Sequence, residues 1–349
     1  MNKKFVLCMI VISAVLTGSA FAVSSYGKYP APQDAFMEVL RLQEEYPGYV
    51  TVGELGKSAN KRTIRYARIA KPGAEGLPQA LIVADIHGNE WIGNRVAMSM
   101  MWRLLRDRGS DEWVASLLDR MEFWIIPVMN PDGYMKTWEE RGNKSAQWAH
   151  MRKNANGVDL NRNFPLPAER TVDMDMAGST DPDHIRYMGP HPYSEPETQL
   201  VRDFVESHSF FAAIDFHSNW GTLFPPKCNG PSCEKQFKKM LEPARARQVH
   251  VKYPIVMQWQ VDSFSGEMED ALFYDYGIMA VCWEVYPETM AKEQHAKPGF
   301  EHPFWSMNPD DIDYWIENDR DAALAAIEAA YNLTGGKPVP EKYRQVRLK

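Results

Sequence analysis

The chain has 349 residues, of which 44% are hydrophobic and 24% are charged, and its formal net charge is -7 at pH 7. That length is enough for one large α/β domain or two smaller ones, and no linker-like composition interrupts the chain, which favours one. The negative charge argues against nucleic acid or an anionic membrane surface as the main partner.

The first 22 residues have the three-part pattern of a cleaved secretory signal. Two lysines precede an apolar stretch from Phe5 to about Leu16, and the small-residue string Ala20-Phe21-Ala22 follows. The apolar stretch is shorter than the roughly 20 residues that span a bilayer, and there is no second one. We therefore predict a signal peptide over 1–22, one domain over 23–349, export to the periplasm or the extracellular space, and no stable membrane span after cleavage.

Hydrophobic periodicity predicts helices that alternate with strands along the rest of the chain. Helices are expected at 35–46, 93–105, 197–206 and 310–332, and strands as a pair within 49–69 and at 81–86, 121–128, 211–217 and 277–283. This alternation implies an α/β fold with a largely parallel sheet covered on both faces. We expect Asn130-Pro131-Asp132-Gly133 to form a turn and 165–191 to form a long surface loop.

The cysteines fit an oxidising compartment. Cys228 and Cys233 bracket the turn-forming string Asn-Gly-Pro-Ser, which favours a local disulfide between them. A metal-binding pair would need a second ligand pair that the chain does not offer. Cys282 lies in an apolar run and is expected to be a buried small hydrophobe.

Two strings about 130 residues apart supply metal-ligating side chains. His87-Gly88-Asn89-Glu90 follows the strand at 81–86, and Phe216-His217-Ser218 lies at the end of the strand at 211–217. The carboxyl ends of parallel strands share one edge of a sheet, so the two strings are expected to meet there. The three ligands His87, Glu90 and His217 suit Zn²⁺ and leave one coordination position open for water. A His and a Glu three apart are, taken alone, more typical of a surface turn.

Two further places carry groups suited to hydrolysis. Arg162 lies beside Asn161 in the amide-rich loop 151–165, and a guanidinium with a neutral amide suits a carboxylate. Glu284 ends the strand at 277–283, where a carboxylate can take a proton from zinc-bound water. The plainer alternatives are loop amides that satisfy their own turns and a solvated acid at a strand end.

With these strings the chain resembles the zinc metallocarboxypeptidases of the funnelin type, and its motifs are most similar to the regulatory carboxypeptidase N/E subgroup. The matching strings follow the family's order across most of 23–349: His-Gly-Asn-Glu at 87–90, Asn-Pro-Asp-Gly at 130–133, Gly-Val-Asp-Leu-Asn-Arg-Asn-Phe at 157–164, Ser-Glu-Pro-Glu-Thr at 194–198, Phe-His-Ser at 216–218, and Glu284. The resemblance implies a three-layer α/β/α sandwich with a mixed, mostly parallel twisted sheet and one Zn²⁺ per chain. The subgroup's C-terminal β-sandwich domain is not expected, because one long helix accounts for the chain after Glu284.

The resemblance also implies roles for the matching residues around the metal. It makes His87, Glu90 and His217 the zinc ligands and Glu284 the general base and later proton donor. Asp159 matches the acid that orients the first histidine ligand, as expected beside a zinc-bound imidazole.

The remaining matches imply an exopeptidase acting on the C-termini of peptides or proteins. Arg152 matches the arginine that polarises the scissile carbonyl and stabilises the oxyanion. Asn161 and Arg162 match the pair that grips the terminal carboxylate, which an endopeptidase would not need.

The chain departs from the family pattern at the position of a mobile tyrosine that caps the substrate. Asp262 or Ser263 falls at that position. Tyr253, Tyr274 and Tyr276 are the residues considered as replacements.

The preference for the released residue is left open by two residues of opposite charge. Glu269 falls near a pocket position that is acidic in members that remove Lys or Arg, which favours a basic residue. Lys227 stands in the stretch where the regulatory subgroup has an aspartate, and it could pair with Glu269, face an acidic substrate or be a solvated loop lysine.

Two alternative functions remain. A cell-wall peptide peptidase of the same fold is disfavoured by the retained Asn161-Arg162 pair, because members with that role commonly depart from it. A zinc- and peptide-binding protein without turnover is disfavoured by the presence of Glu284 and Arg152.

Overall fold

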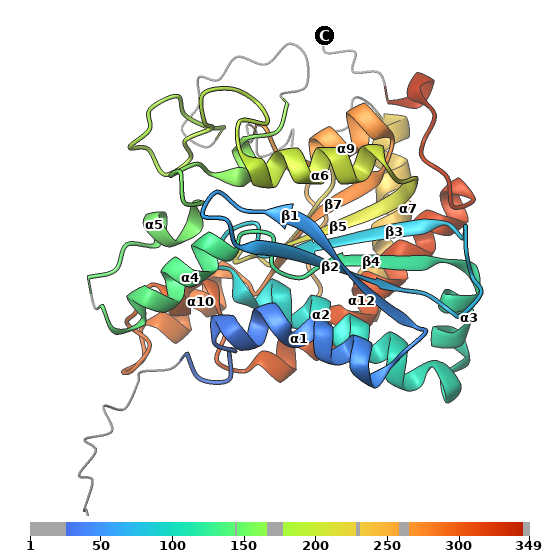
Figure 1. Ribbon diagram of the computed structural model, residues 1–349, viewed down its shortest axis with the longest axis horizontal. Coiled ribbons are helices and arrows are strands. Elements are labelled where there is room, and N and C mark those ends of the chain that lie inside the picture. The colour runs from blue at the N-terminus through green and yellow to red at the C-terminus, as the bar shows by residue number, and fades with distance from the viewer. Residues whose placement is uncertain (1–25, 144, 166–176, 228–230, 258–264, 345–349) are drawn as a thin grey trace, which may run out of the picture.

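The computed structural model describes residues 26–143, 145–165, 177–227, 231–257 and 265–344 (Figure 1). Within these ranges seven strands form one mixed sheet in the order β1-β2-β4-β3-β5-β7-β6. The central strands β4, β3, β5 and β7 are parallel, whereas β1, β2 and β6 form antiparallel pairs toward the edges. The strands are β1 (Val50–Lys57), β2 (Thr63–Ile69), β3 (Gln79–Ala84), β4 (Glu122–Ile126), β5 (Phe210–Ser218), β6 (Thr222–Phe224) and β7 (Met279–Val285).

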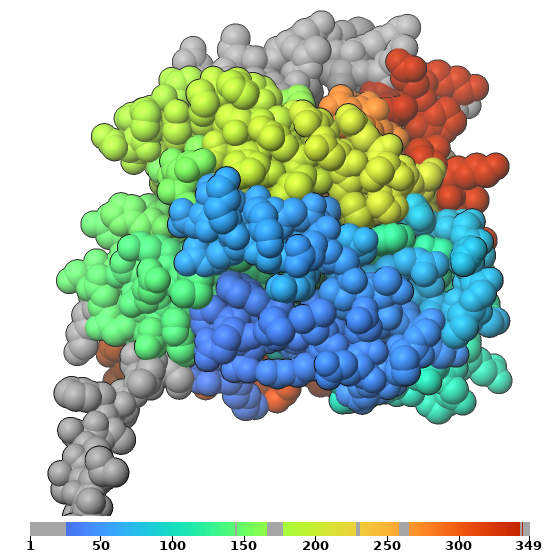
Figure 2. Space-filling view, in the orientation of Figure 1, coloured from blue at the N-terminus to red at the C-terminus, as the bar shows by residue number. Residues whose placement is uncertain are grey.

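Helices cover both faces of the sheet and make three layers, as predicted (Figure 1). One core cluster joins the strands to α1 (Pro32–Glu45), α2 (Trp91–Arg106), α3 (Glu112–Arg120), α7 (Pro231–Arg247) and α12 (Ile312–Thr334). A second cluster joins the other face to α6 (Pro196–Glu206) and α9 (Met268–Tyr276). In Figure 2 the blue segments with α1 and β1 lie beside the lime segment with α6, so the edge strand runs between the two helical layers.

Alternation along the central strands supplies both clusters. In β3, Ala80, Ile82 and Ala84 belong to the first cluster, while Leu81 and Val83 belong to the second. Because both faces are covered, all nine residues of β5 are buried, which explains why the central strands read as continuous apolar runs.

The shorter helices α4 (Pro131–Glu139), α5 (Trp148–Arg152), α10 (Glu288–His295) and α11 (Phe304–Met307) lie in the connections. The turn predicted at 130–133 is wrong, because this string begins α4. The side chain of Asn130 accepts from the backbone N–H of Gly133 at 2.8 Å and caps the helix, with Pro131 in its first turn. The same residue types favour turns and helix starts, so local sequence did not separate the two.

Several predictions fall on residues outside the described ranges. The signal peptide at 1–22, Cys228 and residues 166–176 of the predicted loop lie there, and the remainder of that loop, 177–191, contains neither helix nor strand. Cys282 is buried, as predicted. Cys233 is disulfide-bonded, and its predicted partner Cys228 is among the residues outside the described ranges. No helix among the described residues is long and apolar enough to cross a membrane.

Candidate active site

Three side chains with metal-ligating atoms meet at the carboxyl ends of β3 and β5. His87 lies in the connection after β3, Glu90 is the residue before α2, and His217 is near the end of β5. Their ligand atoms all lie within 4.8 Å of one another, and the three side chains are buried. Nδ1 of His217 lies 3.1 Å from Nδ1 of His87 and 3.1 Å from Oε2 of Glu90.

The outer nitrogens of both imidazoles face carboxylates. Nε2 of His87 lies 3.1 Å from Oδ1 of Asp159, and Nε2 of His217 lies 2.8 Å from Oδ2 of Asp215. If each Nε2 carries the proton and its N–H donates a hydrogen bond to the carboxylate, both Nδ1 lone pairs converge with Glu90 on one point. Three acceptors that converge on one point favour a bound cation, and the set fits Zn²⁺ in chemistry and in number.

The charges around His217 favour a positive species at the same point. Burial lowers the pKa of this imidazole, but the Asp215 and Glu90 carboxylates raise it well above its usual range. Burial also raises the pKa of Glu90, yet His87 and His217 outweigh burial and hold it below its usual range.

Two glycines allow the ligand loop to approach α4. A Cβ added to Gly88 would collide with the backbone of Gly133, and one added to Gly133 would lie 2.9 Å from Cα of Gly88. The backbone N–H of Gly88 also donates to the carbonyl of Arg152 at 3.1 Å. The strings at 87–90 and 130–133 are therefore parts of one packed unit, in which both glycines are needed for close approach.

Arg152, at the end of α5, points toward the ligands. Its Nε donates to Oδ2 of Asp159 at 2.9 Å, and its Nη1 lies 3.3 Å from Oε1 of Glu90. Asp159 therefore holds both Arg152 and His87. Burial lowers the pKa of Arg152, but Asp159 and Glu90 raise it overall, so its charge is retained.

Glu284 on β7 lines a cavity that His87, Glu90 and His217 also line and that is called the metal cavity below. Its register partner on β5 is His217, and its Oε2 accepts from the backbone N–H of Trp220 at 3.3 Å. Burial and the Glu90 carboxylate raise the pKa of Glu284 to about 8. Cys282, two residues earlier on the same strand face, also lines the cavity.

Asn161 and Arg162 enter the cavity from the loop after α5. Oδ1 of Asn161 accepts from the backbone N–H of Met268 at 2.7 Å, which ties this loop to the start of α9. Nη1 of Arg162 lies 3.4 Å from Oε1 of Glu267, and both side chains are almost fully buried. Glu267 lines the cavity next to them.

Glu269 and Lys227, the two residues that bear on specificity in the sequence, are buried and do not line the metal cavity. Glu269 is fully buried on α9 and does not line the metal cavity; burial and Glu267 raise its pKa well above the usual range. The ammonium of Lys227 is also buried and has no hydrogen-bond partner among the described residues. Its backbone N–H donates to Oδ1 of Asp270 at 2.9 Å.

The position of the family's capping tyrosine, at Asp262 or Ser263, lies outside the described residues. Of the replacements considered, Tyr253 is buried and donates its hydroxyl to Asp319 at 2.9 Å. Tyr276 donates to Glu206 on α6 at 3.1 Å. Neither these tyrosines nor Tyr274 lines the metal cavity.

Sequence reasoning missed Asp215 and Glu267. Asp215 lies two residues before His217 on the same strand, so period-2 alternation places both side chains on one face, a signal that could have found it. Glu267 was not predicted, because the acidic pocket position of the family falls near Glu269, two positions later.

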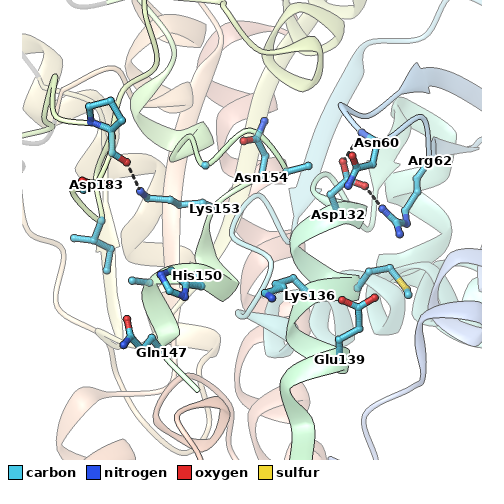
Figure 3. A pocket seen from close by; sticks show the side chains of 16 residues that line it. Asn60, Arg62, Asp132, Lys136, Glu139, Gln147, His150, Lys153, Asn154 and Asp183 are labelled. Atoms are coloured by element: carbon cyan, nitrogen blue, oxygen red, sulfur yellow. Dashed lines mark hydrogen bonds and ion pairs between the residues drawn. The ribbon is translucent and has the colours of Figure 1, made fainter. Parts of the chain in front are cut away.

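A larger groove, with a volume of about 580 Å³, lies on the side of α5 away from the metal cavity (Figure 3). Trp148 and Arg152 line the metal cavity, whereas His150 and Lys153 line this groove. Lys153 is largely buried and donates to the carbonyl of Pro182 at 3.3 Å, as the dashed line in Figure 3 shows. None of the predicted ligands or catalytic residues lines the groove.

Comparison with known proteins places most of the chain in one family of sequences. The family model described as zinc carboxypeptidase matches residues 35–305. The chain is 32% identical over 211 residues to mast cell carboxypeptidase A of Rattus norvegicus, which is 58% of this chain and 48% of the relative. It is 26% identical over 287 residues to carboxypeptidase A2 of the same organism, covering 73% and 66%. The chain spans about half the length of most of the first relatives it matches.

Solved structures share the fold. Carboxypeptidase A from Helicoverpa armigera aligns with a TM-score of 0.71 at 22% identity over 90% of this chain and 78% of the other. Thrombin activatable fibrinolysis inhibitor aligns with a TM-score of 0.69 at 22% identity over 87% and 74%.

Proposed function

The chain belongs to the zinc carboxypeptidase family, and we propose that it is an exopeptidase that hydrolyses the C-terminal peptide bond of peptides or proteins. The observation that carries the proposal is the lining of one cavity. Two kinds of group line it. The three metal ligands and an acid are His87, Glu90, His217 and Glu284, and the groups that can bind an anion are Arg152, Arg162 and Asn161.

His87, Glu90 and His217 would hold the zinc ion that the family uses. When bound, Zn²⁺ supplies a Lewis acid and lowers the pKa of a coordinated water to about 7. Asp159 and Asp215 orient the two imidazoles through their Nε2 atoms.

Glu284 and Arg152 would carry out the proton transfer and the charge stabilisation that hydrolysis requires. Glu284 takes a proton from the attacking water and then delivers it to the leaving amine. Arg152, held by Asp159, donates to the scissile carbonyl oxygen, where negative charge develops.

Asn161 and Arg162 restrict the reaction to the end of a chain. A buried guanidinium and an amide bind the terminal carboxylate with directed hydrogen bonds. A substrate without that carboxylate would leave Arg162 facing Glu267 with no added partner. Exopeptidase action is therefore the expected mode.

We further propose that the released residue is basic, and that Glu267 sets this preference. Glu267 lines the cavity beside Arg162, so an ammonium or guanidinium of the substrate could reach it while the carboxylate binds the arginine. Glu269 is fully buried and does not line the cavity, and its raised pKa favours the neutral carboxyl, so it is not expected to bind the basic side chain. Lys227 is the opposing charge, and it does not line the cavity.

A panel of peptides tests the function. Each peptide is supplied with a free or an amidated C-terminus, and released amino acids are measured with and without a zinc chelator. We expect release of the last residue from free acids only, lost with the chelator and restored by Zn²⁺. Tight binding of peptides by the wild type without any cleavage would favour the binding-protein alternative, and cleavage confined to cell-wall peptides would favour the other. Detection of the mature protein in a cell-free culture fluid or periplasmic extract tests export.

A further inference from the structure

We infer that Tyr26 and Tyr29, in the segment before α1, are positioning residues for the metal-binding loop 87–90. The inference rests on the proposed zinc site. Both rings are almost fully buried, 2% and 4% exposed, although they precede the first helix of the fold. The segment 26–30 will be called the N-terminal clasp.

The clasp is anchored by three hydrogen bonds from aromatic hydroxyls. Tyr26 donates to the carbonyl of Thr137 at 3.0 Å, and Tyr29 donates to the carbonyl of Pro309 at 2.8 Å. Tyr134 of α4 donates to the carbonyl of Pro30 at 2.9 Å. The clasp therefore joins α4 to the segment between α11 and α12.

Both of these anchoring elements bind the metal loop directly. The carbonyl of Gly88 accepts from Oγ1 of Thr137 at 2.7 Å and from Nε1 of Trp91 at 2.8 Å. Asn308, beside Pro309, donates to the carbonyl of Asn89 at 2.7 Å. The backbone between the ligands His87 and Glu90 is thus held by groups that the clasp connects.

The clasp also packs against the residue that follows the ligand Glu90. The ring of Tyr26 stacks on Phe304 with centroids 3.7 Å apart and meets Trp91 edge-on at 5.6 Å. Trp91 in turn stacks on Tyr134 at 3.7 Å. Removing the Tyr26 ring opens a cavity beside Trp91, so the start of α2, and with it Glu90, loses its fixed direction.

The matched test measures zinc affinity rather than activity. Tyr26→Ala and Tyr26→Phe are compared with Phe237→Ala, a fully buried aromatic on α7 that contacts Phe273. Zinc dissociation constants are obtained by competition with a chromogenic chelator, and melting temperatures are recorded with chelator and with excess Zn²⁺. The second readout separates a purely structural role, which would lower both melting temperatures equally.

We expect Tyr26→Ala to bind zinc about tenfold more weakly, at the lower end of the effect of supporting residues at metal sites. Tyr26→Phe keeps the ring and removes only the hydroxyl, which donates to the carbonyl of Thr137 at 3.0 Å and lies 3.5 Å from Nδ1 of His302. A smaller loss of zinc affinity is therefore expected, and this variant remains informative if Tyr26→Ala does not fold. Phe237→Ala should lower stability without changing zinc affinity. Unchanged affinity in the Tyr26 variants, or an equal loss in Phe237→Ala, overturns the positioning role alone. A wild type that binds no zinc overturns the proposed function as well.

Discussion

Asp215 lies with Oδ2 2.8 Å from Nε2 of His217, and both side chains are buried on β5. Asp159 has the same relation to His87, but it also accepts from Nε of Arg152. The two carboxylates therefore support the metal set alike and differ in what else they hold.

Asp215→Asn is predicted to weaken zinc binding by roughly 10- to 100-fold, because the amide no longer holds the imidazole by a charged acceptor. Once saturated with zinc, it should recover most of the wild-type kcat. Asp159→Asn should show the same loss of zinc affinity and, in addition, a low kcat at saturating zinc, because Arg152 loses its anchor. Equal kcat values for the two zinc-saturated variants would contradict the separate role of Asp159.

Glu284→Gln is predicted to lower kcat by about 10²- to 10⁴-fold, since the amide cannot accept a proton from water. Zinc content should remain unchanged, because Glu284 is outside the proposed ligand set. Metal analysis and steady-state kinetics on the same sample check this. Loss of zinc in this variant would assign Glu284 to the metal instead.

Glu267→Gln is predicted to lower kcat/KM for peptides ending in Lys or Arg by about tenfold, the value of one charge-assisted contact. Peptides ending in Leu should be affected less. Glu269→Gln is the matched control, because Glu269 is buried outside the cavity lining and glutamine has nearly the same side-chain volume as glutamate. A larger specificity change in Glu269→Gln than in Glu267→Gln would reverse the assignment.

The raised pKa of the buried Asp319 side chain predicts how the free energy of unfolding depends on pH. Burial raises its pKa to about 6, against the hydrogen bonds from Trp283, Gln248, Tyr253 and Asn318. The folded state therefore keeps a proton on Asp319 that the unfolded state releases from about pH 4. The contribution of this group to the free energy of unfolding is present at low pH and is lost as the pH rises to about 6. The free energy of unfolding falls by about 3 kcal/mol over this range.

Urea unfolding of the metal-free protein between pH 4 and 7 checks this contribution, with Asp319→Asn as the comparison. The variant should lack the part of the slope that Asp319 causes. Parallel pH profiles for the two proteins would show that Asp319 does not hold the proton.

The sequence was most informative where chemistry and strand periodicity agree. The apolar runs before His87 and around His217 predicted strands of a largely parallel sheet, and the four central strands are parallel as expected. The residues that support the ligands were harder to find, because their partners are distant in sequence. Tyr26 reaches Thr137 across 111 positions, and no local pattern marks such a contact. Glu267 likewise depends on how α9 is placed against Arg162.

Titration of the metal-free protein with Zn²⁺, while it acts on a peptide and on the same peptide with an amidated C-terminus, tests the central claim most directly. We predict that release of the last residue from the free acid rises to a plateau at one zinc per chain, and that the amide is not cleaved. Full activity in the metal-free protein, or equal cleavage of the acid and the amide, would contradict the assignment of a zinc-dependent carboxypeptidase.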